Sequence, residues 1–321
     1  MNVRRRLIPA ALASALGLGA LTACSSDSAA SGNTDKFDVV ASFYPMAFLA
    51  EQIGGDHANV TSLTEPGQEP HDLEISTKQR AQLEEADAAL YLKGLQPAVD
   101  EAVGQTGIKT KIDAASLTHL EDHGTGGHTH EGEEGHAEEE GHPEEEEHAR
   151  DPHVWLDPVK YAEIAQGVGK AFEKADPDHA ADYKKNTEAL VKKLNGLNGD
   201  FENGLKNTKS KVFFTNHAAF GYLAERYGLT QEAISGIDPE SEPSGARVRE
   251  LQQEAEADGV TTVFYETLVS DKTAKTLARD ANLKTDVLDP LEGITDKSRG
   301  DDYFQVMESN LKALQAALGA K

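Results

Sequence analysis

The stretch F-D-V-V-A-S-F-Y-P-M-A-F-L-A-E-Q-I-G-G, residues 37–55, decides the fold class of this 321-residue chain. Residues 37–43 are rich in β-branched and aromatic side chains, which favours a strand, and a Tyr-Pro step ends that strand. A helical pattern follows over residues 46–53 and is closed by two glycines. The stretch therefore predicts a strand, a turn and a helix, which together are the repeating unit of an α/β fold.

The same alternation continues along the chain. Further strands are expected at 59–63, 88–92, 109–112, 211–215, 260–265 and 285–288, and further helices at 76–86, 97–103, 159–174, 177–205, 218–227 and 302–318. Such alternation predicts mostly parallel sheets with helices on both faces and ligands bound outside the carboxyl ends of the strands. The length favours two lobes, each with its own core, and the helix at 177–205 is long enough to span both.

The N-terminus has the layout of a signal peptide. M-N-V-R-R-R precedes the apolar run 7–23, which is short for a membrane span and ends in L-T-A-C. This ending resembles the lipobox of bacterial lipoproteins, and Cys24 is the only cysteine in the chain. We expect cleavage after residue 23, a lipid on Cys24 and a flexible tether at 24–35, which place the protein outside the cell membrane and anchored to it. The alternative is a secretory signal that happens to contain a cysteine.

The charge of the chain limits its partners. The formal net charge is -25, from 56 acidic and 31 basic residues, so binding to nucleic acid is not expected and cationic partners are favoured. Segment 119–148 contains twelve acidic residues and no Lys or Arg, so it is expected to be a disordered loop. Its seven histidines are His119, His123, His128, His130, His136, His142 and His148. This loop is expected either to form weak auxiliary metal sites or to be a tolerated polar insertion.

Three histidines lie outside this loop at the predicted edges of strands and helices. They are His71, His153 and His217; His153 belongs to D-P-H-V-W-L-D-P, residues 151–158, which also contains the only tryptophan. Three imidazoles with one carboxylate form a tetrahedral sphere that suits Zn²⁺. The residues alone leave a second interpretation open, namely three unrelated surface or capping histidines.

Six motifs, in order along nearly the whole mature chain, resemble one known family. They are E-P-H-D-L-E-I-S at 69–76, D-P-H-V-W-L-D-P at 151–158, T-N-H-A-A-F-G-Y-L-A-E-R-Y-G-L at 215–229, E-P-S at 242–244, V-F-Y-E at 263–266 and L-D-P-L-E-G at 288–293. Together they resemble the zinc/manganese class of solute-binding proteins that serve metal-importing ABC transporters. The resemblance implies two α/β lobes, at 36–176 and 207–321, joined by one long rigid helix at 177–206, with the metal site between the lobes.

The resemblance also implies the ligands. His71 and His153 come from the N-terminal lobe and His217 from the C-terminal lobe. Glu292 is the favoured fourth ligand, with Asp289 as the alternative. Glu266 is expected to orient an imidazole by accepting its free N–H. The competing interpretation of all three carboxylates is helix capping and solvent-facing charge.

A third histidine favours zinc over manganese, because manganese-type members resemble a pattern with two histidines and two carboxylates. The predicted function is a monomeric extracytoplasmic receptor, not an enzyme, that delivers Zn²⁺ as cargo to a membrane permease. Alternatives are a manganese receptor of the same class, a secreted zinc metallohydrolase, and a surface protein whose loop merely buffers metal. A hydrolase needs an open coordination position, and no H-E-x-x-H or G-x-S-x-G motif occurs in the chain.

Overall fold

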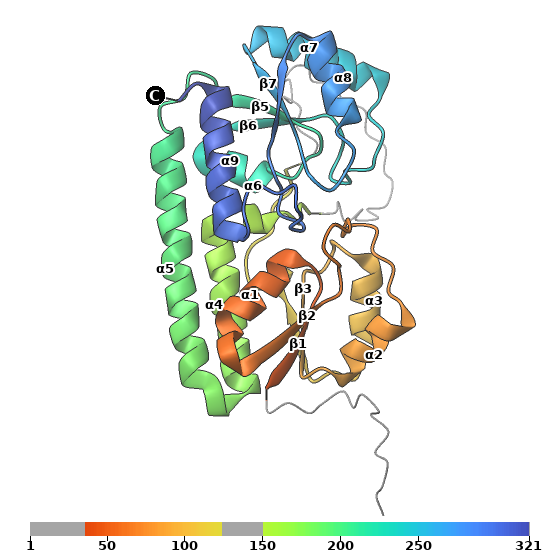
Figure 1. Ribbon diagram of the computed structural model, residues 1–321, viewed down its shortest axis with the longest axis vertical. Helices are drawn as coiled ribbons and strands as arrows, with labels where there is room; N and C mark the ends of the chain where they lie inside the picture. The colour runs from red at the N-terminus through yellow and green to blue at the C-terminus, as the bar shows by residue number, and fades with distance from the viewer. Residues whose placement is uncertain (1–35, 124–149, 321) are drawn as a thin grey trace, which may run out of the picture. The chain divides into compact units, whose positions relative to one another are not determined.

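Two parallel sheets organise the computed structural model, which describes residues 36–123 and 150–320 (Figure 1). Each sheet has four strands, in the orders β2-β1-β3-β4 and β6-β5-β7-β8. Every neighbouring pair is parallel. We call the parts built on the first and second sheets the N-terminal and C-terminal lobes. The predicted α/β class with two parallel-sheet lobes is confirmed.

The elements of the N-terminal lobe are β1 (Phe37–Ala41), α1 (Tyr44–Gly54), β2 (Ala58–Ser62), α2 (Thr77–Glu85), β3 (Ala88–Tyr91), α3 (Pro97–Gln105), β4 (Thr110–Asp113) and α4 (Pro158–Ala175). Those of the C-terminal lobe are β5 (Val212–Thr215), α6 (Gly221–Tyr227), β6 (Thr230–Ala233), α7 (Gly245–Ala257), β7 (Thr262–Tyr265), α8 (Lys272–Asp280), β8 (Lys284–Val287) and α9 (Tyr303–Leu318). Helix α5 (Ala180–Leu205) lies between the two sets in sequence, and short 3₁₀ turns include η3 (Val154–Leu156) and η4 (Pro177–His179).

The structure differs from the sequence-based prediction mainly in the C-terminal lobe. Elements β6, α7 and α8 were not predicted. Strand β6 is short and polar, and the helices α7 and α8 are polar overall and bury only two and three residues, so their apolar faces are narrow. Helix α6 begins at Gly221 rather than at residue 218. The N–H of Ala218 donates to the carbonyl of Gly236 at 2.9 Å, which bonds the segment before α6 to the loop after β6.

Helix α5 runs alongside both lobes (Figure 1). It contacts α1 and α4 in the N-terminal lobe and α6 and α9 in the C-terminal lobe. Its buried residues recur every three or four positions, which gives one continuous apolar stripe. They are Tyr183, Thr187, Leu190, Leu194, Leu197, Phe201 and Leu205.

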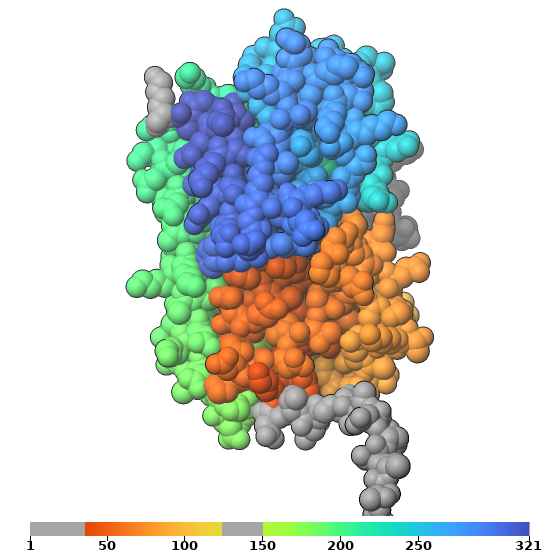
Figure 2. Space-filling model, viewed as in Figure 1, coloured from red at the N-terminus to blue at the C-terminus, as the bar shows by residue number. Residues whose placement is uncertain are grey.

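Trp155 links the two lobes at the centre of the molecule. Its Nε1–H donates to the carbonyl of Pro290 at 2.7 Å, and its own carbonyl accepts from the hydroxyl of Tyr303 at 2.7 Å. Its indole packs edge-on against Phe43, with ring centroids 5.0 Å apart. Figure 2 shows the lobes in contact along one boundary on the face in view. The turn that carries His153 is therefore fastened to the loop that precedes Glu292.

Several expectations fall outside the described residues. They are the signal peptide, the lipid on Cys24, the tether, and the loop histidines from His128 to His148. Within residues 36–123 and 150–320, no helix combines the length and the apolar character needed to cross a bilayer.

The packing of α4 on α5 yields a stability prediction. Gly169 faces Thr187 so closely that an added Cβ would overlap the threonine side chain. We expect Gly169→Ala to destabilise the protein by about 1–3 kcal/mol, because overpacking outweighs the gain of about 1 kcal/mol in helix propensity. Gly196→Ala, at an exposed position of α5 with open space around it, should instead be stabilising. Denaturant midpoints measure both effects, and equal midpoints for the two variants would contradict the packing argument.

Candidate metal site

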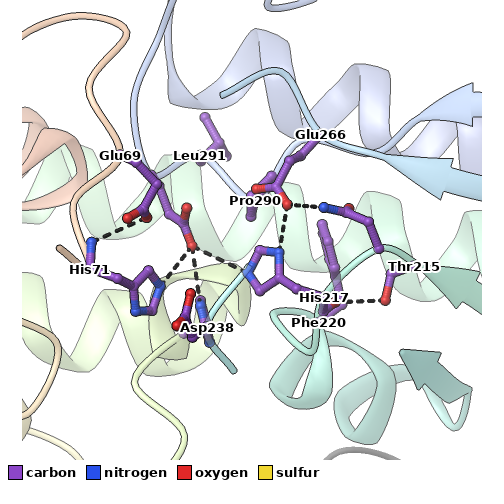
Figure 3. A network of polar contacts seen from close by, with 12 residues as sticks. Glu69, His71, Thr215, His217, Phe220, Asp238, Glu266, Pro290 and Leu291 are labelled. Carbon is purple, nitrogen blue, oxygen red and sulfur yellow. Dashed lines mark hydrogen bonds and ion pairs between the residues drawn. The ribbon is translucent and has the colours of Figure 1, made fainter. Parts of the chain in front are cut away.

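Three imidazoles converge on one carboxylate between the lobes. The Nε2 atoms of His71, His153 and His217 lie 3.3, 3.2 and 3.4 Å from Oε1 of Glu292. Figure 3 shows His71 and His217 approaching this oxygen from opposite sides. The four side chains are almost entirely withdrawn from solvent, and the most exposed of them, that of His71, is 10% exposed.

The folding of both sheets explains why these residues meet. His71 lies in the connection that follows β2, and His153 lies at the start of η3. His217 follows β5 by two residues, and Glu292 lies in the loop after β8. In the C-terminal lobe β5, β7 and β8 are successive neighbours, so their carboxyl ends lie side by side.

The distances match a tetrahedron better than a set of hydrogen bonds. Zinc bonds of about 2.0–2.1 Å at tetrahedral angles place neighbouring ligand atoms about 3.3–3.4 Å apart. Charge-assisted hydrogen bonds between nitrogen and a carboxylate are shorter, about 2.7–2.9 Å. The separations of 3.2–3.4 Å from Glu292 to the three imidazoles are therefore those expected of ligands around one metal ion.

Asp151 sets the orientation of His153. One of its oxygens accepts from the backbone N–H of His153 at 2.9 Å and lies 2.8 Å from Nδ1 of the same residue. Since a carboxylate can only accept, Nδ1 carries a proton, and Nε2 is the nitrogen left to bind a metal ion. The indole of Trp155, 5.3 Å from the imidazole, packs beside it.

Glu266 has the same relation to His217. Its Oε1 lies 2.7 Å from Nδ1 of His217 and also accepts from the side-chain amide of Asn216. Glu266 directly follows β7, the strand next to β5, so the sheet itself places carboxylate and imidazole together. This is the orienting contact that the sequence analysis expected of Glu266.

Glu69 accepts hydrogen bonds from the backbone around the third histidine, His71. Its Oε1 accepts from the N–H of His71 at 3.1 Å, and its Oε2 accepts from the N–H of Asp72 at 3.3 Å. Burial and the nearby charge of Glu292 raise the pKa of Glu69 to about 7. Hydrogen bonds to Glu69 thus fix the backbone of the loop that carries His71.

Asp289 is engaged within its own loop. It accepts from the N–H of Leu291 at 2.9 Å and from the hydroxyl groups of Thr267 and Ser298 at 3.2 and 3.0 Å. Burial raises its pKa to about 6. Among the described residues, the group of ligand atoms around Glu292 does not include Asp289. Asp289 is thus placed to hold the backbone that presents Glu292.

Three buried polar atoms at the site lack a hydrogen-bond partner. They are Nε2 of His217, Oε2 of Glu266 and Oε2 of Glu292. A buried polar atom without a partner costs about 1–3 kcal/mol, and a cation at the centre of the four side chains would satisfy Nε2 of His217. The donor set of three nitrogens and one oxygen fits a divalent ion of borderline softness such as Zn²⁺.

The protonation of the site without metal follows from these contacts. Burial alone would lower the pKa of His153 and His217, but their bonds to Asp151, Glu266 and Glu292 raise both above the usual 6.5. Burial alone would raise the pKa of Glu292, but the three imidazoles hold it well below the usual 4.5. These contacts favour protonated His153 and His217 beside an ionised Glu292 when no metal is bound, and a metal ion that binds Nε2 must displace any proton held there.

This protonation predicts how binding depends on pH. We expect metal binding to release protons from His153 and His217, so affinity falls as pH is lowered through their raised pKa values. Calorimetry in buffers of different ionisation enthalpy counts the protons at each pH. Proton release that does not increase as pH is lowered would contradict the assignment.

The same groups set the pH dependence of stability in the metal-free protein. The raised histidine pKa values stabilise the folded state below about pH 6.5, and this contribution is lost as pH rises through them. The lowered pKa of Glu292 stabilises the folded state above about pH 4.5, and this contribution is lost as pH falls through it. Both contributions are present between those limits, where metal-free stability is expected to be highest.

The other histidines lie elsewhere. His57 and His179 stack on each other, with ring centroids 4.1 Å apart, at the far end of α5. The carbonyl of His119 accepts from Lys160, and His123 lies in a second cluster described below. The sequence analysis did not assign Asp151 or Glu69, although each lies two positions before a predicted ligand, a spacing that could have revealed both.

Comparison with known proteins agrees with this geometry. The chain is 38% identical over 310 residues to the zinc-binding lipoprotein AdcA of Streptococcus pneumoniae; the match covers 92% of this chain and 58% of AdcA. The chain thus spans little more than half the length of that relative. It is 36% identical to the high-affinity zinc uptake system protein ZnuA of Bacillus subtilis, with 95% of this chain and 98% of that protein covered.

Solved structures have the same fold. The Zn(II)-bound ZnuA-like domain of Streptococcus pneumoniae AdcA superposes with a TM-score of 0.72 at 34% identity, covering 88% of this chain and 99% of that one. The laminin-binding protein Lbp of Streptococcus pyogenes gives a TM-score of 0.72 at 30% identity, covering 87% and 98%. A family model matches residues 39–317, and the chain belongs to the family described as zinc-uptake complex component A, periplasmic.

Proposed function

We propose that this protein is an extracytoplasmic receptor that binds one Zn²⁺ through His71, His153, His217 and Glu292 and delivers it to a membrane ABC importer. The observation that carries the proposal is the set of separations of 3.2–3.4 Å between the three Nε2 atoms and Oε1 of Glu292. They match the length of three of the six edges expected of a zinc tetrahedron. The zinc-binding function of the similar proteins supports the same cargo.

The donor set favours zinc over manganese. Three imidazole nitrogens and one carboxylate oxygen suit a borderline ion, whereas manganese prefers a site richer in oxygen.

The site is better suited to holding a metal ion than to catalysis. Four protein ligands complete a tetrahedron, whereas catalytic zinc keeps one position open for water or substrate. The other carboxylates beside the three histidines already accept hydrogen bonds: Asp151 from His153, Glu266 from His217, and Glu69 from the backbone N–H of His71. Since these carboxylates are engaged, a transport receptor is favoured over a metallohydrolase.

Delivery requires that a tightly bound ion can be released. Two ligands belong to the N-terminal lobe and two to the C-terminal lobe, so a small separation of the lobes would break the coordination sphere. The partner in this proposal is an ABC permease that receives the ion when the lobes separate. We further propose that the receptor acts as a monomer anchored to the cell membrane through a lipid on Cys24.

The ligand assignment predicts the effect of single substitutions. Replacing His71, His153 or His217 by Ala should weaken zinc binding by about tenfold or more, since each removes one bond to the metal. Glu292→Ala should weaken binding more than Asp289→Ala, because Asp289 acts only through the loop. Zinc calorimetry measures each variant, and His57→Ala is the control, since His57 lies outside the site. Unchanged affinity in any of the three histidine variants would remove that histidine from the site.

The anchor predicts a change of location. Cys24→Ala removes the thiol that a lipid would modify, so the variant should leave the membrane fraction while keeping its zinc affinity. Cell fractionation and immunoblotting compare it with wild type. A variant that still sediments with membranes would show that the lipid is not the anchor.

A further inference from the structure

A second group of potential metal ligands lies apart from the site around Glu292. It consists of Glu121, His123 and Glu225, each of which offers one ligand atom within 4.8 Å of the others. Nε2 of His123 lies 2.8 Å from Oε2 of Glu225. Glu121 and His123 precede the segment 124–149, and Glu225 lies on α6 of the C-terminal lobe.

The imidazole of His123 is held in a fitted position. Its Nδ1 lies 2.8 Å from Oδ2 of Asp151, and its ring packs edge-on against Tyr222 with centroids 4.3 Å apart. A Cβ at residue 221 would come within 2.5 Å of the His123 side chain and 2.8 Å of Asp151, so Gly221 leaves the room that the ring needs. The ring is therefore fixed with Nε2 toward Glu225.

The backbone around the cluster is tied down as well. The N–H of Asp151 donates to the carbonyl of Glu121 at 3.0 Å. The N–H of Glu121 donates to the hydroxyl of Tyr222 at 2.8 Å, and that hydroxyl donates to the carbonyl of Asp151 at 2.8 Å. Glu225 is three residues beyond Tyr222 on α6 and so lies on the same side of that helix.

The arrangement of the three side chains suits a cation. Nδ1 of His123 lies 2.8 Å from the carboxylate of Asp151 and donates to it, so Nε2 is the nitrogen left to bind a ligand. The separation of 2.8 Å between Nε2 and the carboxylate of Glu225 is that of a hydrogen bond, so without metal a proton lies between them, and a metal ion would take the place of that proton. This is the arrangement of metal-bound histidines, whose second nitrogen donates to a carboxylate.

The surrounding charge is strongly negative. Lys160 binds one oxygen of Glu121 at 2.6 Å and offsets part of the charge. The side chains of Glu121 and Glu225 are 30% and 59% exposed, so an ion can reach them from solvent. The net charge of -25 favours cations over anions throughout.

We propose that Glu121, His123 and Glu225 form a second divalent-cation site, with one nitrogen and two oxygen ligands and the remaining positions filled by water. Zinc fits this mixed set, whereas magnesium and calcium prefer oxygen alone. Partial exposure and only three protein ligands make the site weaker than the one around Glu292. Because its ligands come from both lobes, a bound ion would link the lobes at a second point. The proposal does not depend on the identity of the transported cargo.

The direct test is crystallography of the full chain with Zn²⁺. Anomalous difference density measured at the zinc edge should show an ion bonded to Nε2 of His123 and to the carboxylate of Glu225, in addition to the ion at Glu292. A map with density at Glu292 and none at His123 would overturn the second site. Density at His123 alone would overturn the proposed function and leave the second site standing.

Zinc titration against a chelator tests the same site in solution. In the full-length variants His123→Gln and Glu225→Gln, the zinc ion that binds more weakly than the one at Glu292 should lose at least about tenfold in affinity. The histidines at 128–148 are present in every variant, so their contribution cancels. Gly221→Ala keeps all three ligands but crowds His123, so it should also weaken binding of this second zinc ion.

Matched controls separate ligation from general charge effects. His57→Gln removes a histidine that has one carboxylate partner, Asp182, at 3.0 Å, and Glu202→Gln removes an exposed glutamate of α5. Both controls should bind zinc as wild type does. Tight binding of one zinc ion at Glu292 shows that each variant is folded. Equal binding curves for wild type, His123→Gln and Glu225→Gln would refute the site.

Discussion

The structure depends on one buried charge, the carboxylate of Glu292. Its side chain is fully withdrawn from water, which for an isolated carboxylate would cost many kcal/mol. Three imidazoles from distant parts of the chain surround it and hold its pKa well below the usual value. The contacts that make this buried charge tolerable therefore also suit the site to a cation.

The ligands are oriented by a further layer of carboxylates. Asp151 and Glu266 each accept from the Nδ1–H of a histidine and so turn its Nε2 toward the centre. The loop before Glu292 passes through Leu291, whose φ of 60° costs a non-glycine residue roughly 1–2 kcal/mol. Asp289 and the bond from Trp155 to Pro290 hold this loop in place. The geometry of the ligands thus rests on contacts between the lobes as well as within them.

Asp151 has a double role that links the two clusters. One oxygen accepts from Nδ1 of His153 at the site around Glu292, and the other accepts from Nδ1 of His123 at the proposed second site. Both clusters take ligands from both lobes, so both depend on the same relative position of the lobes. A protein that delivers its cargo by letting the lobes separate would lose both sets of contacts together.

The amino-acid sequence was enough to predict the α/β class, most of the alternation of strands and helices, the three histidines, and Glu292 and Asp289 as candidates for the carboxylate. Local composition and family motifs carry that information, and both can be read without knowing the fold. They did not reveal β6, a short polar strand, or the helices α7 and α8, which are polar overall and bury only a few residues. The folded structure was needed to show that Glu292 rather than Asp289 faces the imidazoles, because the turn at Leu291 directs the two carboxylates to different surroundings. It alone also placed Glu225 beside His123, since the two residues are 102 positions apart and meet only when the lobes pack together.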